Sequence, residues 1–470
     1  MMKHFIFSLI FLLCPFAFVF TQTLSLQARV DKLIEEFLPP GSEVGVCIYN
    51  LTEKQQLYAY RDDKLSRPAS TMKLLTAITA LAQKGGIEPF HTNVWYKGAI
   101  EHDTLRGDLY VVGGFDPEFG DLEMDSLVNQ VRALPFSVIQ GKVYGDVSMK
   151  DSLYWGNGWA WDDTPSSFQP YMSPLMFHKG MVKVTATPTV KGDTASLIIE
   201  PFSTYYTISN ETQSRTPDAG KFSVSRNWLE NGNSIVVKGN VDSRRMGEVN
   251  IYPSQDYFMH TFVHRLRGSG VEVDTLYMYQ EFVADSTAVH VFQLGCPVQR
   301  ILNEVMKKSD NLCAEALLYR LAAQYTGKKR VSAEDGLKAV NRMIEQLGHN
   351  SKNYKLADGC GLSNYNYVSP ALLVDFLKFA YSRTDIFQRL YKSLPIAGID
   401  GTLQYRMNKG SKALKKVNAK TGSFTGISTL AGYARSSNGD DIAFAIMNQN
   451  VMRLADARKL QDKICEILCE

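Results

Sequence analysis

The sequence predicts an α/β domain that is built from both ends of the chain and interrupted by a β-rich insertion. Two short strand patterns, 43–49 and 56–60, stand near the N-terminus, and another pair, 428–435 and 441–447, stands near the C-terminus. Between about 91 and 285 the pattern changes to short alternating segments punctuated by Gly, Asn, Asp and Pro. We therefore expect the terminal strands to meet in one sheet across the insertion.

Helical patterns frame these strands. Apolar residues recur at helical spacing in 23–38, and Pro39-Pro40-Gly41 ends that helix. An almost wholly apolar helix follows Pro68, and we expect it to be buried. Asn438-Gly439 predicts a hairpin between the last two strands. Further helices are predicted at 297–306, 311–325, 333–347 and 453–469. We expect 23–90 and 286–470 to form one domain and 91–285 to form one or two inserted subdomains.

The first 22 residues resemble a secretory signal. Lys3 and His4 precede an apolar run of about 16 residues, Phe5–Phe20. This run is shorter than the roughly 20 residues that span a bilayer core, which argues against the alternative of an uncleaved anchor. We expect residues 1–22 to be removed on export, no membrane span to remain, and the mature chain to be secreted, periplasmic or associated with the cell envelope. Cys14 lacks the small preceding residue of a lipidation site.

Composition excludes several classes of function. The 470 residues carry a net charge of +3, without the basic stripe that a nucleic-acid partner requires. Hydrophobic residues make up 45% of the chain, which is a globular balance. Six cysteines follow Cys14 at scattered positions, and we expect most of them to be small buried residues. No cofactor or metal is expected. His260 and His264 lack the adjacent glutamate of a zinc peptidase, so we expect them on a helix face.

Ser70 and Lys73 are candidates for a nucleophile and its base. Helical spacing of three residues brings their side chains to one face at the start of the buried apolar helix. A serine hydroxyl needs a neighbouring base, and a lysine can serve when burial and a nearby cation lower its pKa. A surface pair of no function is the alternative, because this spacing arises often by chance.

Two more short motifs follow along the chain. Ser309-Asp310-Asn311 lies at a break between helical patterns, where a simple helix N-cap is the alternative. Lys420-Thr421-Gly422, followed by Ser423, leads into the last strands, where a polar strand end is the alternative. The order and spacing of all three motifs match the Ser-x-x-Lys, Ser-x-Asn and Lys-Thr-Gly set of the penicillin-binding proteins and serine β-lactamases.

The chain resembles the class C (type-4) penicillin-binding proteins in particular, from about residue 28 to the C-terminus. This resemblance rests on Gly113-Gly114-Phe115-Asp116-Pro117, Gly145–Ser148, Gly158–Asp163, Asp358–Ser363, Leu394–Gly398 and Asp400–Leu403, as well as on the long insertion. Cys360 stands where the family usually has serine, and Phe177-His178-Lys179-Gly180 stands where it is usually richer in asparagine. We expect neither departure to touch the three motifs.

The resemblance implies a D-alanyl-D-alanine carboxypeptidase/endopeptidase with a transpeptidase-like catalytic domain, acting on peptidoglycan stem peptides. Ser70 would attack the carbonyl of the penultimate D-alanine, and Lys73 would take its proton. Ser309 would relay a proton to the leaving amine, between Lys73 and Lys420. β-Lactam antibiotics would trap the acyl-enzyme as covalent inhibitors.

Four further residues would bind the substrate. Asn311 would contact a substrate amide, Lys420 with Thr421 the terminal carboxylate, and Gly422 would admit the substrate backbone. The backbone N–H groups of Ser70 and Ser423 would form the oxyanion hole.

Several alternatives stay open at the level of the sequence. Asp162 and Asp163 are candidates for binding the side-chain amine of the third stem residue, or form a solvated acidic turn. A β-lactamase-like hydrolase would use the same motifs, although the chain lacks a Glu-x-x-Leu-Asn segment between Asn311 and Lys420. A non-catalytic cell-wall-binding protein is the other alternative. The balance of carboxypeptidase and endopeptidase action is not encoded in the motifs.

Overall fold

The computed structural model describes residues 25–84, 86–274 and 276–470. The predicted signal segment 1–22 therefore lies outside the described residues, as does Cys14. Within the described part, no helix is both long enough and apolar enough to cross a membrane.

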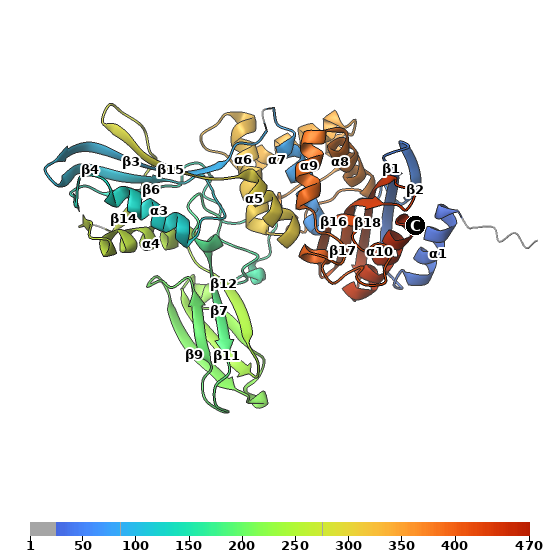
Figure 1. Ribbon diagram of the computed structural model, residues 1–470, viewed down its shortest axis with the longest axis horizontal. Coiled ribbons are helices and arrows are strands. Elements are labelled where there is room, and N and C mark those ends of the chain that lie inside the picture. Colours follow the sequence, from blue (N-terminus) through green and yellow to red (C-terminus); the bar gives the residue numbers. More distant parts are fainter. Residues whose placement is uncertain (1–24, 85, 275) are drawn as a thin grey trace, which may run out of the picture.

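A five-stranded antiparallel sheet joins the two ends of the chain (Figure 1). Its order is β16 (Val417–Phe424), β17 (Gly426–Arg435), β18 (Asp441–Val451), β1 (Glu43–Asn50) and β2 (Gln55–Tyr60). The pairing of β1 with β18, in which Val46 faces Ile446, confirms the expectation that N- and C-terminal strands form one sheet.

Helices cover both faces of this sheet. Successive residues of a strand point to opposite faces, so the apolar side chains on each face pack against their own set of helices. Along β18, Phe444 packs in one core with α1 (Leu26–Phe37) and α10 (Leu454–Leu468), whereas Ala445 packs in the other. That second and larger core is built from α2 (Met72–Leu81), α5 (Val298–Asn303), α6 (Asn311–Thr326), α7 (Ala333–Gln346), α8 (Pro370–Ser382) and α9 (Thr384–Ser393). All ten residues of α2 are buried, as its apolar sequence predicts.

One part of the insertion is a mixed sheet with two helices, α3 (Asp121–Arg132) and α4 (Ser254–Gly268). The strands of this sheet are β3 (Phe90–Glu101), β4 (Thr104–Val112), β5 (Val138–Ile139), β6 (Val143–Asp146), β13 (Glu272–Val273), β14 (Tyr277–Tyr279) and β15 (Ala288–Cys296). Because β15 pairs with β3, the sheet continues past residue 285. His260 and His264 lie on α4, and the ring of His260 is hydrogen-bonded to Thr204 at 2.8 Å.

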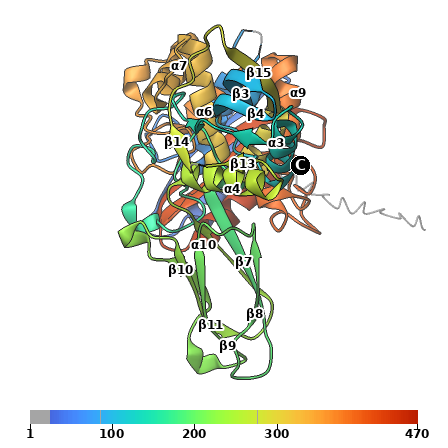
Figure 2. The same cartoon turned by 90° about the vertical axis from the view of Figure 1, so that its left-hand side faces the viewer.

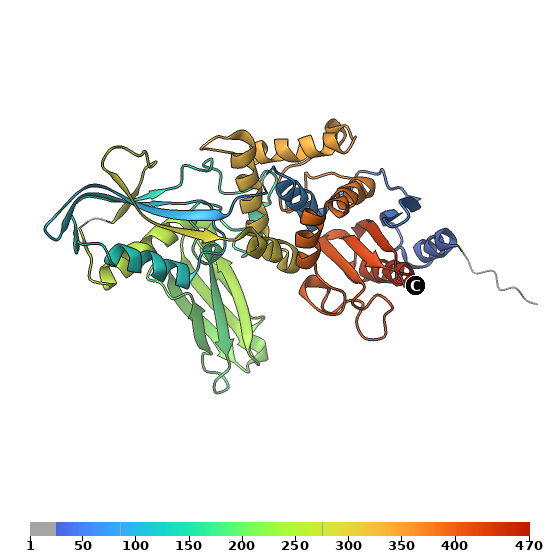
Figure 3. The same cartoon turned by 45° about the horizontal axis from the view of Figure 1, so that its top comes forward.

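Two three-stranded sheets complete the insertion and project away from the rest of the chain (Figures 2 and 3). One contains β7 (Met181–Thr187), β8 (Ser196–Glu200) and β12 (Arg245–Asn250), and the other contains β9 (Thr207–Ser214), β10 (Ser223–Arg226) and β11 (Ser234–Val241). The architecture is thus an α/β domain split by a β-rich insertion, as predicted.

The fold brings the three sequence motifs together. A 3-10 turn, Ala69–Thr71, leads directly into buried α2, and Ser309 ends a π-helical segment, Glu304–Lys308, before α6. The strand β16 forms the edge of the five-stranded sheet and lies against the 3-10 turn. The six cysteines after residue 24 are all buried and unpaired.

Candidate active site

Ser70 and Lys73 lie within hydrogen-bond distance, with Ser70 Oγ 3.0 Å from Lys73 Nζ. Their contact follows from local geometry, since the turn and the first residues of α2 bring positions three apart to one side. Ala69, immediately before the serine, has a φ of +46°, a left-handed conformation that a residue with a Cβ rarely adopts. Strain of this kind is typical of functional turns, and here it directs Ser70 into the cleft.

Lys73 is fully buried, and three oxygen atoms surround its ammonium group. Besides contacting Ser70, it donates to Asn311 Oδ1 and to the carbonyl oxygen of Cys360, each at 2.7 Å. Burial lowers the pKa of Lys73, and this effect exceeds the opposing influence of Cys360 and of nearby carboxylates such as Asp358. A lysine with a lowered pKa is suited to accept a proton from the serine beside it.

A second lysine–serine pair comes from β16 and the segment before α6. Lys420 Nζ donates to Ser309 Oγ and to the carbonyl of Thr421, each at 2.8 Å. Lys420 is also fully buried, and burial together with the charge of Lys73 holds its pKa well below the ordinary value. Ser309 therefore faces Lys420, whereas Lys73 is bonded to Ser70 and Asn311.

Gly422 is required by the close approach of β16 to the turn that carries Ser70. A Cβ at this position would lie 2.3 Å from Thr429 Oγ1 and 2.8 Å from both the Ser70 nitrogen and the Pro68 oxygen. Contacts below 3.0 Å are sterically forbidden for a side chain, so only glycine lets the strand lie here. The backbone of Ser70 is thereby brought next to the strand that carries Ser423.

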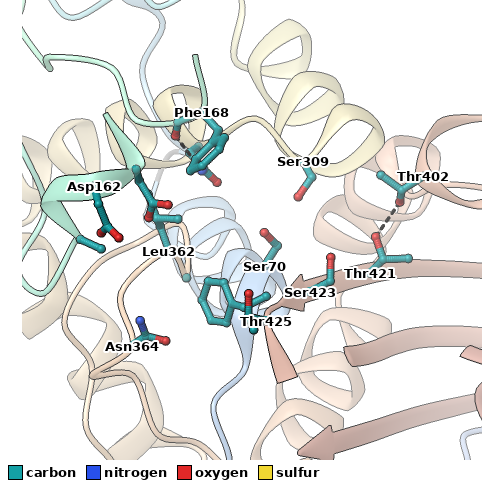
Figure 4. Close-up of a pocket in the computed structure, with 16 residues that line it drawn as sticks. Ser70, Asp162, Phe168, Ser309, Leu362, Asn364, Thr402, Thr421, Ser423 and Thr425 are labelled. Carbon is teal, nitrogen blue, oxygen red and sulfur yellow. Dashed lines mark hydrogen bonds between the residues drawn. The ribbon is translucent and has the colours of Figure 1, made fainter. Parts of the chain in front are cut away.

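A cleft of about 590 Å³ opens over these residues (Figure 4). The predicted residues that line it are Ser70, Asp162, Asp163, Ser309, Asn311, Thr421, Gly422 and Ser423. Burial and the neighbouring charge of Asp162 raise the pKa of Asp163. The lining also includes Phe168, Leu362, Asn364 and Thr402, which the sequence analysis did not single out. Thr402 Oγ1 accepts from Thr421 Oγ1 at 2.7 Å, and Phe168 accepts from Asn311 Nδ2 through its carbonyl oxygen at 2.9 Å.

Both departures from the family pattern contact the motifs, contrary to our expectation. The carbonyl of Cys360 accepts from Lys73, while its thiol lies 3.5 Å from Asp358 Oδ2. Because the contact with Lys73 is made by the backbone, a cysteine in place of serine leaves it intact. Lys179 Nζ lies 2.6 Å from Asp310 Oδ2, in the middle of the second motif. Neither contact follows from sequence spacing, since both join residues more than 100 positions apart.

Glu315 and Asp358 form a buried acidic pair behind Lys73. Asp358 accepts from the Trp159 indole at 2.9 Å and from the backbone of Gly361 and Ser363. Glu315 Oε1 accepts from the backbone nitrogens of Gly359 and Cys360 at 2.8 and 2.7 Å, which fixes the turn whose carbonyl meets Lys73. Burial and the charge of Asp358 raise the pKa of Glu315 to about 7.

Glu315→Gln is expected to change the pH dependence of stability. A carboxyl whose pKa rises on folding from 4.5 to about 7 costs the folded state free energy as pH rises through that window. The variant, which keeps the two backbone hydrogen bonds, should therefore gain up to about 3 kcal/mol in unfolding free energy relative to wild type between pH 4.5 and 8. Urea unfolding of both proteins at pH 4.5 and at pH 8 measures this difference in unfolding free energy. Glu36→Gln, on the exposed face of α1, is the control. An equal difference at both pH values would contradict the prediction.

The site defines a class of protein: a serine acyl-enzyme of the penicillin-binding and β-lactamase superfamily. Its marks are a serine next to a buried lysine, a second serine–lysine pair facing it, and a glycine-bearing edge strand. Residues 26–470 match the D-Ala-D-Ala carboxypeptidase 3 (S13) family, and the chain belongs to that family. It is accordingly a serine-type carboxypeptidase/endopeptidase of the class C penicillin-binding proteins.

Known proteins agree with this assignment over most of the chain. The D-alanyl-D-alanine carboxypeptidase of Actinomadura sp. strain R39 is 28% identical over 446 residues, which is 90% of this chain and 80% of that protein. The fold is similar to that of penicillin-binding protein 4 from Haemophilus influenzae, with a TM-score of 0.79, 24% identity, and coverage of 93% and 98% of the two chains. A peptidoglycan endopeptidase of Bdellovibrio bacteriovorus shares the fold at a TM-score of 0.52 and 15% identity, over 91% and 92% of the chains.

Proposed function

We propose that this protein hydrolyses the amide that follows the penultimate D-alanine of peptidoglycan stem peptides, through an acyl-enzyme on Ser70. The observation that carries the proposal is the 3.0 Å contact between Ser70 and the buried Lys73 at the floor of the cleft. Two of the relatives named above are described as a D-alanyl-D-alanine carboxypeptidase and as a peptidoglycan endopeptidase, which supports the proposal.

In the proposed reaction, Lys73 accepts the proton of Ser70 as the serine oxygen attacks the carbonyl. Ser309, hydrogen-bonded to Lys420, passes a proton to the leaving amine. Water then attacks the ester and releases Ser70. The lowered pKa of both lysines supports these roles, because general acid–base groups work best when their pKa lies near the working pH.

Substrate binding is assigned to residues of β16, of α6 and of the turn that carries Ser70. Thr421 and Lys420 bind the terminal carboxylate, and the backbone nitrogens of Ser70 and Ser423 receive the developing oxyanion. One N–H of the Asn311 side-chain amide donates to the Phe168 carbonyl oxygen. The second N–H of that amide donates to a substrate carbonyl.

Asp162 and Asp163 bind the side-chain amine of the third residue of the stem peptide. Both line the cleft. Figure 4 shows Asp162 on the side of the cleft opposite Thr421. Burial, and then the charge of Asp162, raise the pKa of Asp163, so an ammonium group that pairs with both carboxylates would offset their repulsion.

The double change Asp162→Asn and Asp163→Asn is expected to abolish this amine preference. Wild-type enzyme should cleave a peptide with a free third-residue amine about 10-fold better than its N-acetylated form, because a charge-assisted pair contributes about 1.5–3 kcal/mol. The ratio of kcat/KM for the two peptides should fall to about 1 in the variant. A ratio that is unchanged would remove both residues from substrate recognition.

The protein acts outside the cytoplasm, where peptidoglycan lies. The predicted export signal at 1–22 supports this location. β-Lactams inhibit by acylating Ser70, and a solved complex of Haemophilus influenzae penicillin-binding protein 4 holds a β-lactam.

Digestion of purified muropeptides tests the proposal. Release of free D-alanine from pentapeptides indicates carboxypeptidase action, and conversion of cross-linked dimers to monomers indicates endopeptidase action. If penicillin acylates the protein but the protein forms neither product, the proposed substrate is contradicted. Rapid penicillin turnover without either product would favour a β-lactamase-like hydrolase.

A further inference from the structure

Lys179 belongs to the insertion, yet its ammonium group lies among three carboxylates at the border of the catalytic site. Lys179 Nζ is 2.6 Å from Asp310 Oδ2, 2.8 Å from Glu118 Oε1 and 3.0 Å from Glu304 Oε2. The four side chains are only 12–18% exposed, so these ion pairs are largely shielded from water. Screening by solvent and salt is therefore weak, and each pair is stronger than a surface ion pair.

The backbone around Lys179 has an unusual left-handed conformation. His178, Lys179 and Gly180 have φ angles of +46°, +59° and +65°, three consecutive left-handed residues of which two carry a Cβ. Such conformations persist only where surrounding contacts hold them. Here the His178 backbone nitrogen donates to the Phe119 oxygen at 2.9 Å, and its ring lies 2.8 Å from Asp121.

Asp310 connects Lys179 to the second catalytic motif. Its Oδ1 accepts from the Cys313 backbone nitrogen at 2.8 Å and caps α6, while its Oδ2 pairs with Lys179. Its neighbours on either side are Ser309, which has a φ of +61°, and Asn311. One carboxylate thus fixes both the start of α6 and the turn that carries Ser309.

Glu304 pairs with Lys179 at the other end of the segment that carries Ser309. It begins the π-helical turn Glu304–Lys308, which ends at Ser309, and turns of this type occur mostly at functional sites. Lys179 therefore pairs with both ends of the seven-residue segment 304–310, which directly precedes Asn311. From the cleft side, the Phe168 carbonyl holds the Asn311 amide at 2.9 Å, so the insertion contacts this motif twice.

We propose that Lys179 is a positioning residue of the insertion, which holds Ser309 and Asn311 in the geometry that acylation of Ser70 requires. The proposal rests on the proposed function, because Lys179 acts only through these two residues. It also gives the insertion a part in the reaction itself, beyond lining the cleft.

The charge of Lys179 suits this role. Burial alone would lower the pKa of Lys179, but Cys313, Asp310 and Glu118 raise it above the ordinary value. Burial alone would raise the pKa of Asp310, but the charge of Lys179 holds it below its usual range. Both partners therefore stay ionised, and the pair persists across the pH range in which lysine and aspartate are normally charged.

Acylation kinetics of Lys179→Met test the proposal. Stopped-flow mixing with penicillin separates the dissociation constant of the first complex from the acylation rate constant. We expect the rate constant to fall about 100-fold, the loss typical of a misplaced catalytic group, with a smaller change in the dissociation constant. Lys179→Arg should recover most of the rate, because it keeps the charge. Lys183→Met is the matched control, since Lys183 lies four residues away and forms an ion pair with exposed Glu200.

Thermal unfolding identifies the variants that fold. If Lys179→Met does not fold, the double variant Lys179→Gln with Glu304→Gln removes the tether to Asp310 without changing the net charge of the cluster, and it should show the same loss. A folded variant that acylates within about threefold of wild type would overturn the proposal. Wild-type protein that penicillin does not acylate would instead overturn the proposed function.

Discussion

Replacing Ser70 with alanine is expected to lower kcat/KM for a D-alanyl-D-alanine peptide by about 10⁶-fold, the loss observed when a serine peptidase loses its nucleophile. The cleft, both lysines and the oxyanion-forming backbone would remain, so substrate would still bind. Without the hydroxyl, however, no ester can form. Release of D-alanine, measured by a coupled assay, gives the rate.

The matched control is Ser243→Ala, in the exposed turn between β11 and β12 and away from the cleft. Its rate should equal that of wild type. A Ser70→Ala protein that keeps more than about one-hundredth of the wild-type rate would exclude Ser70 as the nucleophile.

Replacing Lys73 with methionine is expected to lower the acylation rate constant by about 10³-fold or more, the usual contribution of a general base. Methionine fills a similar volume, but it cannot take the proton of Ser70 or bond to Asn311. Lys64→Met, which removes a surface pair with Glu43, should leave the rate unchanged. An equal rate in the Lys73 variant would assign the base to another group.

The pH profile gives an independent check on the same base. Because Lys73 must be neutral to accept a proton, the acylation rate should fall as pH falls through its pKa. Burial lowers that pKa, so the acid limb should lie below the ordinary lysine value of 10.5. In Lys73→Met this limb should disappear. Retention of the limb would show that it belongs to a different group.

Contacts within one helix turn could be predicted from the sequence. Ser70 and Lys73 meet because they are three residues apart at the start of a helix whose apolar sequence also predicts its burial. The pairing of the terminal strands followed in the same way from short alternating segments at both ends of the chain. These features depend on periodicity and spacing, which a single sequence records directly.

Contacts across the insertion could not be predicted in this way. Lys179 and Asp310 are 131 positions apart, and their pairing depends on how the insertion docks against the segment before α6. Similarly, Glu315 stands in a helix of ordinary composition, and only the fold shows that it holds the turn at Cys360. Side chains that hold catalytic residues in place without lining the cleft have no recognisable pattern in the local sequence, because tertiary packing determines their partners.

The intact mass of the mature protein before and after penicillin treatment tests the central claim most directly. We expect a stoichiometric mass gain in wild type, located in the peptide that contains Ser70, and no gain in Ser70→Ala. A gain that persists in Ser70→Ala, or the absence of any gain in wild type, would contradict the assignment of Ser70 as the acylated nucleophile.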